Sequence, residues 1–202
     1  MEERISFTSG AYALEGLLHR SATPLGLGIV ITHPHPLFGG NMHNSLVETL
    51  ARTCAAAGAT TLRFNFRGSG QSQGGYEEGR GEQTDVKAAV DRLHANGVET
   101  VDVAGYSFGA WVAALAVVAG LKVRRLIMIS PPLAFVDFTP IQSLPPLHLV
   151  VSGDKDEIAP VDAIGRALPV WQPRTHFEII AGADHFYIGH LEALAERLRM
   201  HL

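Results

Sequence analysis

Two short segments of the chain match the pattern Gly-x-Ser-x-Gly. Residues 70–74 read Gly-Gln-Ser-Gln-Gly around Ser72, and residues 105–109 read Gly-Tyr-Ser-Phe-Gly around Ser107. In this pattern the serine sits on a sharp turn between a strand and a helix, so its hydroxyl group stands clear of the backbone. The small flanking residues let the two elements pass closely. A serine held in this way can serve as a nucleophile.

The surroundings of the two serines favour Ser107. Residues 101–104 predict a strand just before Ser107, and the apolar residues 110–121 predict a buried helix just after it. Ser72 instead lies in polar, glycine-rich sequence without a helix start, which is typical of a loop. The alternative role for Ser107 is that of a serine that caps the helix and takes no part in chemistry.

A nucleophilic serine needs a base, and we expect His185 to be that base. His185 follows directly after the predicted strand 176–180. His176 lies inside that strand, and His190 and His201 lie on the predicted final helix, 188–201. The alternative for His185 is an ordinary histidine of a surface loop.

The base in turn needs an acid that orients it, and the loop after the predicted strand 147–151 offers Asp154, Asp156 and Glu157. Asp156 is preferred because it lies further into the loop, before the proline that opens the next helix. Asp154 is expected to shape the turn through its own backbone bonds.

The negative charge of a reaction intermediate requires two N–H donors. The first is expected from Phe108, the residue after the nucleophile. The second is expected from the loop 33–41, where the prolines at 34 and 36 have no N–H group. His35 and Leu37 remain, and Leu37 is preferred.

Three histidines near this loop, His33, His35 and His43, raise the alternative of a metal site. A zinc site of this kind needs a further acidic or thiol ligand nearby, and the sequence offers none at a suitable spacing. We therefore expect hydrogen bonds within the loop, and neither a metal ion nor an organic cofactor.

Strands alternate with helices along the chain, which predicts an α/β fold with a mostly parallel central sheet and helices on both faces. Ligands of such sheets bind beyond the carboxyl ends of the strands. The expected strands are residues 3–8, 11–19, 28–32, 60–66, 101–104, 125–129, 147–151 and 176–180, and the expected helices are 44–57, 82–96, 108–119, 160–168 and 188–201.

Composition narrows the class of protein. The 202 residues are 47% hydrophobic and 18% charged, which favours a single globular domain spanning residues 1–202. The net charge of −4 without a basic cluster argues against nucleic-acid binding. The longest apolar run, 110–121, is shorter than the roughly 18 residues of a membrane span. Cys54 has no partner for a disulfide, and the acidic N-terminus is unlike a signal peptide, so a cytoplasmic protein is expected.

The segment between the predicted strands 125–129 and 147–151 contains five prolines. Prolines oppose helix interiors, so this segment is not expected to form a helical lid over the site. The resulting pocket should be shallow, and we expect its apolar wall to suit short acyl chains. Candidate wall residues are Leu37, Phe38, Phe108, Phe135, Phe138 and Tyr187.

The strand order, the turn at 105–109, the acid loop 153–160 and the segment Asp184-His185-Phe186 resemble the α/β-hydrolase superfamily along nearly the whole chain. The segments 33–42, 65–68 and 79–82 resemble a narrower group, the small bacterial hydrolases related to dienelactone hydrolase. This resemblance implies Leu37 as an oxyanion donor. The chain departs from dienelactone hydrolase at the nucleophile, because that enzyme uses cysteine where this chain has Ser107.

The expected function is hydrolysis of small carboxylic esters through an acyl-enzyme on a Ser107–His185–Asp156 triad. A thioesterase or a peptidase would use the same machinery, and a non-catalytic binding protein on a hydrolase scaffold is the alternative from another class. A small-molecule ester is the expected partner, and the sequence is compatible with an oligomer.

Overall fold

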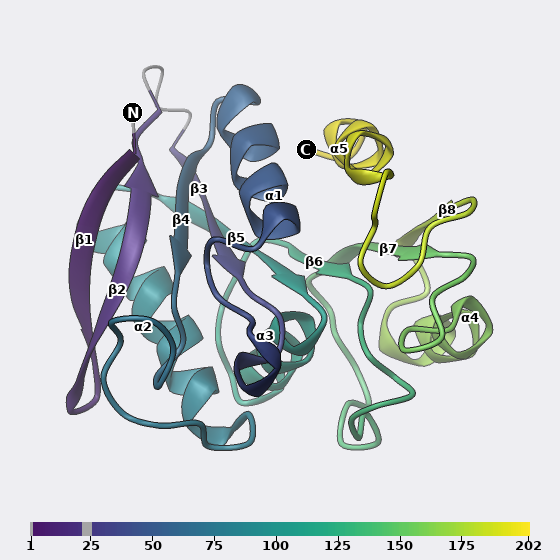
Figure 1. Cartoon of the computed structure of the whole chain (residues 1–202), viewed down its shortest axis with the longest axis horizontal. Coiled ribbons are helices and arrows are strands. Elements are labelled where there is room, and N and C mark those ends of the chain that lie inside the picture. The colour runs from purple at the N-terminus through teal and green to yellow at the C-terminus, as the bar shows by residue number, and fades with distance from the viewer. Residues whose placement is uncertain (1, 22–25) are drawn as a thin grey trace.

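The computed structural model describes residues 2–21 and 26–202. Its strands are β1 (Glu2–Ser9), β2 (Tyr12–His19), β3 (Leu27–Thr32), β4 (Thr60–Phe64), β5 (Thr100–Tyr106), β6 (Leu126–Ile129), β7 (Leu147–Gly153) and β8 (His176–Ile180). These strands form one sheet in the order β1-β2-β4-β3-β5-β6-β7-β8 (Figure 1). The β1–β2 and β2–β4 pairs are antiparallel, and every other pair of neighbours is parallel.

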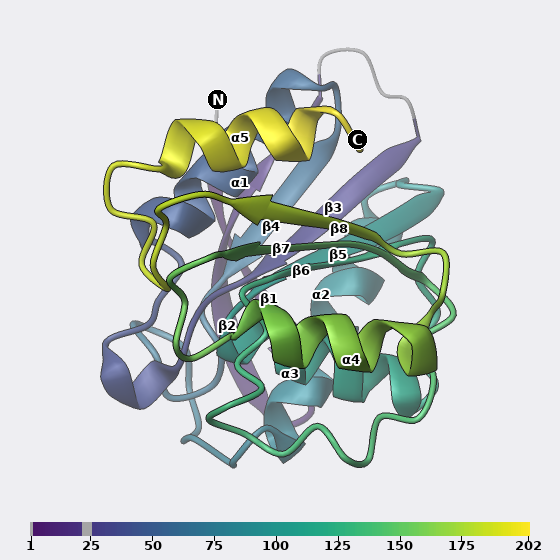
Figure 2. The same cartoon turned by 90° about the vertical axis from the view of Figure 1, so that its right-hand side faces the viewer.

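Helices cover both faces of this sheet. They are α1 (Ser45–Ala56), α2 (Arg80–Ala95), α3 (Phe108–Val118), α4 (Val161–Trp171) and α5 (Leu191–Arg199), with a short 3-10 helix, η1, at Pro36–Phe38. Helices α1 and α5 lie together on one face, and α2, α3 and α4 lie on the other (Figures 1 and 2). The prediction of a mostly parallel sheet with helices on both faces is confirmed.

Two hydrophobic cores result from this layering, one on each side of the sheet. The first packs Phe64, Val103 and Val112 between the sheet and helices α2, α3 and α4. The second packs Ile31 and Leu50 between the sheet and helices α1 and α5. Because β3 and β6 are buried on both faces, their sequences are nearly continuous apolar runs rather than alternating ones.

The only cysteine of the chain, Cys54, belongs to the second core. It lies on α1 and is fully buried. Burial raises the pKa of its thiol to about 12, with a smaller contribution from the charge of Asp102.

The predicted strands and helices are all present, with ends shifted by a few residues. The largest differences concern the last two helices. Helix α4 continues to Trp171 despite Pro169, whose ring is tolerated within its last turn. Helix α5 covers Leu191–Arg199, so His190 and His201 flank the helix instead of lying on it. The 3-10 helix η1 was not predicted.

The segment 130–146, all of which the structure describes, contains turns and bends and no helix. It runs below the sheet edge as an open loop (Figure 1), so the expected absence of a helical lid after β6 is confirmed in this part of the chain. Within the described residues, none of the helices combines the length and the apolar character that a membrane span requires.

Candidate active site

Ser107 occupies the turn between β5 and α3, and its backbone is strained. Its φ of 54° and ψ of −121° lie outside the regions that residues with a side chain normally adopt. The flanking glycines explain how the turn closes. A Cβ atom at Gly105 would lie 2.5 Å from Ala110 Cα, and one at Gly109 would lie 2.6 Å from Thr32 Oγ1. The strand and the helix therefore pass at distances that only glycine permits.

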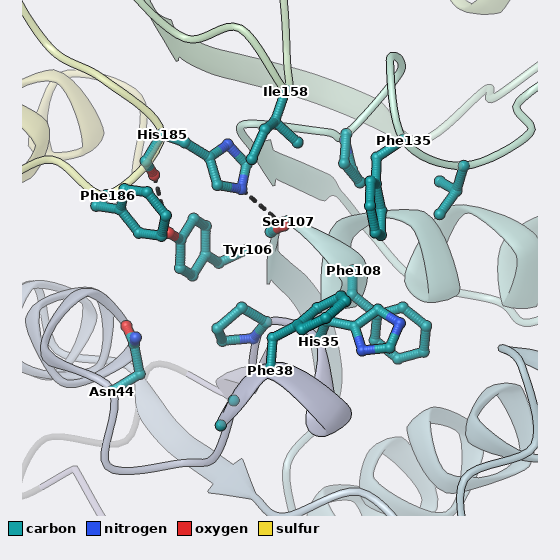
Figure 3. Close-up of a pocket in the computed structure, with 15 residues that line it drawn as sticks. His35, Phe38, Asn44, Tyr106, Ser107, Phe108, Phe135, Ile158, His185 and Phe186 are labelled. Carbon is teal, nitrogen blue, oxygen red and sulfur yellow. Dashed lines mark hydrogen bonds between the residues drawn. The ribbon is translucent and has the colours of Figure 1, made fainter.

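The structure brings Ser107, His185 and Asp156 together. His185 Nε2 lies 2.9 Å from Ser107 Oγ, and His185 Nδ1 lies 2.9 Å and 3.0 Å from the two carboxylate oxygens of Asp156. All three side chains are largely buried. They follow the carboxyl ends of β5, β7 and β8, as predicted. In Figure 3, Ser107 lies between His185 and the aromatic rings of the pocket.

Two backbone N–H groups fix the carboxylate of Asp156 within its loop. Its Oδ1 accepts hydrogen bonds from the backbone N–H groups of Ile158, at 3.0 Å, and Ala159, at 2.7 Å. Burial by itself raises the pKa of this carboxyl, but the hydrogen bond and the charge of His185, together with bonds from Ser130 and Ala159, outweigh it. The net result is a pKa below the usual range, which keeps Asp156 ionised beside the imidazole.

A second layer of polar groups supports this arrangement. Ser130 bonds to Asp156, and its hydroxyl lies 2.9 Å from the hydroxyl of Tyr187. Tyr106 donates its hydroxyl proton to the backbone carbonyl of His185 at 2.8 Å (Figure 3). These contacts fix the loop that carries the imidazole. None of these contacts was predicted, although Ser130 stands at the end of a strand and Tyr106 directly precedes Ser107.

The two competing residues of the sequence analysis have structural roles. Ser72 donates its hydroxyl proton to the carbonyl of Asn65 at 2.7 Å and accepts a bond from the Glu15 N–H at 3.1 Å. Asp154 accepts the Gly182 N–H at 2.7 Å, which ties the acid loop to the loop that follows β8. The side-chain hydrogen bonds of Ser72 and Asp154 thus go to backbone groups outside the site.

The structure corrects the expected second oxyanion donor. Leu37 donates its N–H to the Nδ1 atom of His35 at 3.3 Å and does not line the pocket. Its side chain points outward and is 66% exposed. His35, the alternative considered from the sequence, lines the pocket together with Phe108. The reason for the difference is the tight η1 turn, which directs the Leu37 N–H to the histidine that caps it.

Hydrogen bonds occupy the histidines of this loop, as expected. His33 is fully buried, with Nδ1 2.7 Å from the Pro34 carbonyl and Nε2 accepting the Phe66 N–H at 3.0 Å. Burial lowers its pKa to about 4, although the bond to Pro34 and the charge of Asp85 act in the other direction. The Nε2 atom of His35 lies 3.1 Å from the Tyr76 hydroxyl.

The loop after β4 supports the position of His33. The Arg67 guanidinium bonds to both carboxylate oxygens of the buried Asp85 and to Glu77. Asp85 also accepts the Arg67 N–H at 3.0 Å. These bonds hold the backbone next to Phe66, whose N–H bonds to His33, so the loop after β4 helps to position the loop 33–41.

A cavity of about 440 Å³ opens in front of Ser107. Aromatic rings dominate its wall, and Figure 3 shows the Phe38, Phe108 and Phe135 side chains gathered on the side of Ser107 away from His185. Phe38 is 73% exposed and Phe135 is 56% exposed, so the rim is open to water. Further lining residues that were not predicted are His35, Tyr106, Pro132, Val136, Ile158 and Phe186.

Besides Leu37, two further predicted wall residues lie elsewhere. Phe138 packs against Trp171 in the first core, with ring centroids 5.3 Å apart. Tyr187 is fully buried in the second core and directs its hydroxyl to Ser130. Neither lines the cavity. Both side chains point into a hydrophobic core instead of the cavity. The presence of an aromatic residue in a loop segment does not indicate which of the two it will enter.

Comparisons with known proteins agree with this geometry. No protein-family model matches the chain. The uncharacterized protein RP471 of Rickettsia prowazekii is 32% identical, with 98% of this chain and 88% of that protein covered. An α/β serine hydrolase homologue from Coxiella burnetii has a TM-score of 0.92 at 35% identity, covering 99% of this chain and 97% of that one. A serine hydrolase without a lid from Xanthomonas campestris has a TM-score of 0.89 at 31% identity, covering 98% and 92%.

Proposed function

The chain belongs to the family of α/β serine hydrolases, and from this premise we propose that it hydrolyses carboxylic esters with short acyl chains through an acyl-enzyme on Ser107. The observation that carries the proposal is the continuous chain of hydrogen bonds from Ser107 Oγ through His185 to Asp156. In such a chain the imidazole can take the hydroxyl proton while the carboxylate stabilises the cation that forms.

The first half of the reaction forms the acyl-enzyme. Ser107 Oγ attacks the ester carbonyl carbon, and its proton moves to Nε2 of His185. The carbonyl oxygen becomes an oxyanion, which the N–H groups of Phe108 and His35 stabilise. When the intermediate collapses, the bond to the alcohol oxygen breaks. The departing alkoxide takes the proton from His185, and the alcohol leaves.

The second half releases the acid. A water molecule gives a proton to His185 Nε2 and attacks the acyl carbon, which forms a second oxyanion in the same position. The bond to Ser107 Oγ then breaks, and the serine oxygen regains the proton from His185. Throughout both halves, Asp156 remains ionised and holds Nδ1 of the imidazole, consistent with the direction of its pKa shift.

The form of the cavity supports a small apolar acyl group. The Phe38, Phe108 and Phe135 rings can cover a few methylene groups, and the loop 130–146 adds no helix above them. A longer chain would extend past the rim into water. Each buried methylene contributes about 0.8 kcal/mol, and that gain stops at the rim.

A fluorophosphonate probe followed by mass spectrometry tests the nucleophile. We expect labelling on Ser107 and loss of at least ~10⁴-fold in kcat/KM for a p-nitrophenyl ester in Ser107→Ala. Alanine keeps the Cβ atom at the strained position, so the variant should stay folded. Ser72→Ala is the matched control and should retain activity.

Labelling of Ser72, or an inactive Ser72→Ala with an active Ser107→Ala, would contradict the proposal. Absence of labelling in a folded protein would favour the binding-protein alternative. A parallel panel of ester, thioester and aminoacyl-amide substrates of equal acyl length distinguishes an esterase from a thioesterase and a peptidase.

A further inference from the structure

Three histidines from separate parts of the chain meet at the edge of the sheet far from Ser107. His148 lies on β7, His176 begins β8, and His201 follows α5. One ring nitrogen from each histidine can be chosen so that all three lie within 4.8 Å of one another. These residues are far apart in sequence, and the metal site considered from the sequence involved only His33, His35 and His43, so this group was not predicted.

The arrangement of the rings suits a tetrahedral metal ion. Zn²⁺ binds imidazole nitrogens at about 2.0–2.1 Å, so tetrahedral angles place ligand nitrogens about 3.3 Å apart and ring centres about 5 Å apart. The centroid of His176 lies 5.2 Å from that of His148 and 4.6 Å from that of His201, and the remaining pair is 6.2 Å apart. The ring nitrogens, now up to 4.8 Å apart, would move about 1.5 Å closer to one another when they bind one ion.

The outer contacts of two of these rings resemble those of metal-bound histidines. A metal-bound imidazole almost always donates its other N–H to a carboxylate or a backbone carbonyl. His201 Nε2 lies 3.0 Å from Glu178 Oε1, and His148 Nε2 lies 3.2 Å from the His201 carbonyl. In both rings Nδ1 is then the nitrogen that remains available to a metal ion.

Both acidic and basic side chains surround the three histidines. Glu178 faces the histidines and also pairs with Arg197 at 3.7 Å, while Arg125 donates to the His201 carbonyl at 3.3 Å. The Glu178 carboxylate offsets part of the positive charge that the arginines and a bound ion would bring together.

We propose that His148, His176 and His201 bind one divalent transition-metal ion, of which Zn²⁺ is the best match to three imidazoles and an open position for water. The site lies toward the beginnings of β7 and β8, whereas Asp156 and His185 follow their ends. The ion would join the two ends of the segment 176–201, which carries His185, and would hold α5 against the edge strand (Figure 2).

Zn²⁺ titration of the untagged full-length protein against a chromophoric chelator tests the site. We expect one equivalent to bind, and we expect His176→Ala to weaken that binding at least tenfold, because one of three ligands is lost. His176 is exposed, so its substitution should not disturb folding. His94→Ala, which also removes an exposed histidine, is the matched control and should bind as the wild type does.

Two further variants separate this site from the active site. Ser107→Ala and His185→Ala should bind Zn²⁺ with unchanged stoichiometry and affinity, whatever happens to ester hydrolysis. Glu178→Gln should weaken binding about 10-fold to 100-fold, the usual effect of removing an outer-shell carboxylate. A stoichiometry of zero, equal affinities of His176→Ala and His94→Ala, or loss of the bound equivalent in His185→Ala would overturn the proposal.

Discussion

Asp154 and Asp156 lie two positions apart and hold different partners. Asp156 bonds to the imidazole of His185, whereas Asp154 bonds to the Gly182 N–H. We expect Asp156→Asn to lower kcat/KM by about 10³–10⁴-fold, because an amide neither fixes the tautomer nor stabilises the imidazolium. Asp154→Asn keeps an acceptor for Gly182 and should cost less than tenfold. Kinetics of both variants on one activated ester check this ranking, and the reverse order would assign the acid to Asp154.

His33 gives the fold a dependence on pH. Burial lowers its pKa from the ordinary 6.5 to about 4 in the folded protein. Between pH 6.5 and pH 4, His33 is therefore protonated in the unfolded chain and neutral in the folded one. Stability should therefore fall as the pH drops from 6.5 to 4, by up to about 3 kcal/mol from this residue alone.

Urea unfolding at several pH values, in the wild type and in His33→Gln, measures this contribution. Glutamine can still accept the Phe66 N–H but does not titrate. Between pH 6.5 and 4 the free energy of unfolding should decline more steeply in the wild type, by up to about 1.4 kcal/mol per pH unit. Parallel curves for the two proteins would show that His33 takes up its proton equally in both states.

At the scale of the elements, the crossing of β3 and α3 depends on Gly109. A Cβ atom there would lie 2.6 Å from Thr32 Oγ1 and 2.7 Å from the His33 carbonyl oxygen. We expect Gly109→Ala to destabilise the protein by about 1–3 kcal/mol, since the added methyl group would overlap the Thr32 hydroxyl and backbone atoms of β3 and the residue after it. It should also lower kcat/KM, because the helix that carries the Phe108 N–H is displaced.

Gly165→Ala in α4 is the matched control. A Cβ atom at Gly165 meets nothing within 4 Å, and alanine favours a helix by about 0.5–1 kcal/mol over glycine. Urea unfolding of both variants should therefore give changes of opposite sign. Equal stability of Gly109→Ala and the wild type would mean that the strand and the helix can separate without cost.

The elements and the positions of the three candidate site residues could be predicted because each leaves a local signal. Glycines mark where helices end, apolar runs mark buried strands, and Ser107, Asp156 and His185 each follow a strand. Side-chain direction in loops has no such signal. The Leu37 N–H differs from the expectation because the neighbouring His35 side chain caps the η1 turn and accepts it. Phe138 differs because it packs against Trp171, which is remote in sequence.

At the scale of the whole molecule, the absence of a helix in 130–146 determines how much substrate can be covered. We expect kcat/KM for p-nitrophenyl esters to peak at acyl chains of about two to four carbons and to fall for longer ones. No interfacial activation should appear when the substrate concentration passes its solubility limit. An optimum at twelve or more carbons would contradict an open pocket and would require a tunnel built by this segment or by a second subunit.

The burial of Cys54 means that the folded protein has no readily reactive thiol. The thiolate is the species that reacts with alkylating reagents, and a pKa of about 12 leaves almost none of it at neutral pH. Modification of Cys54 must then wait for the second core to open, so its rate reports how often the native state is lost. A cysteine introduced on the surface would be alkylated selectively, which makes the chain suited to attachment of a single fluorophore.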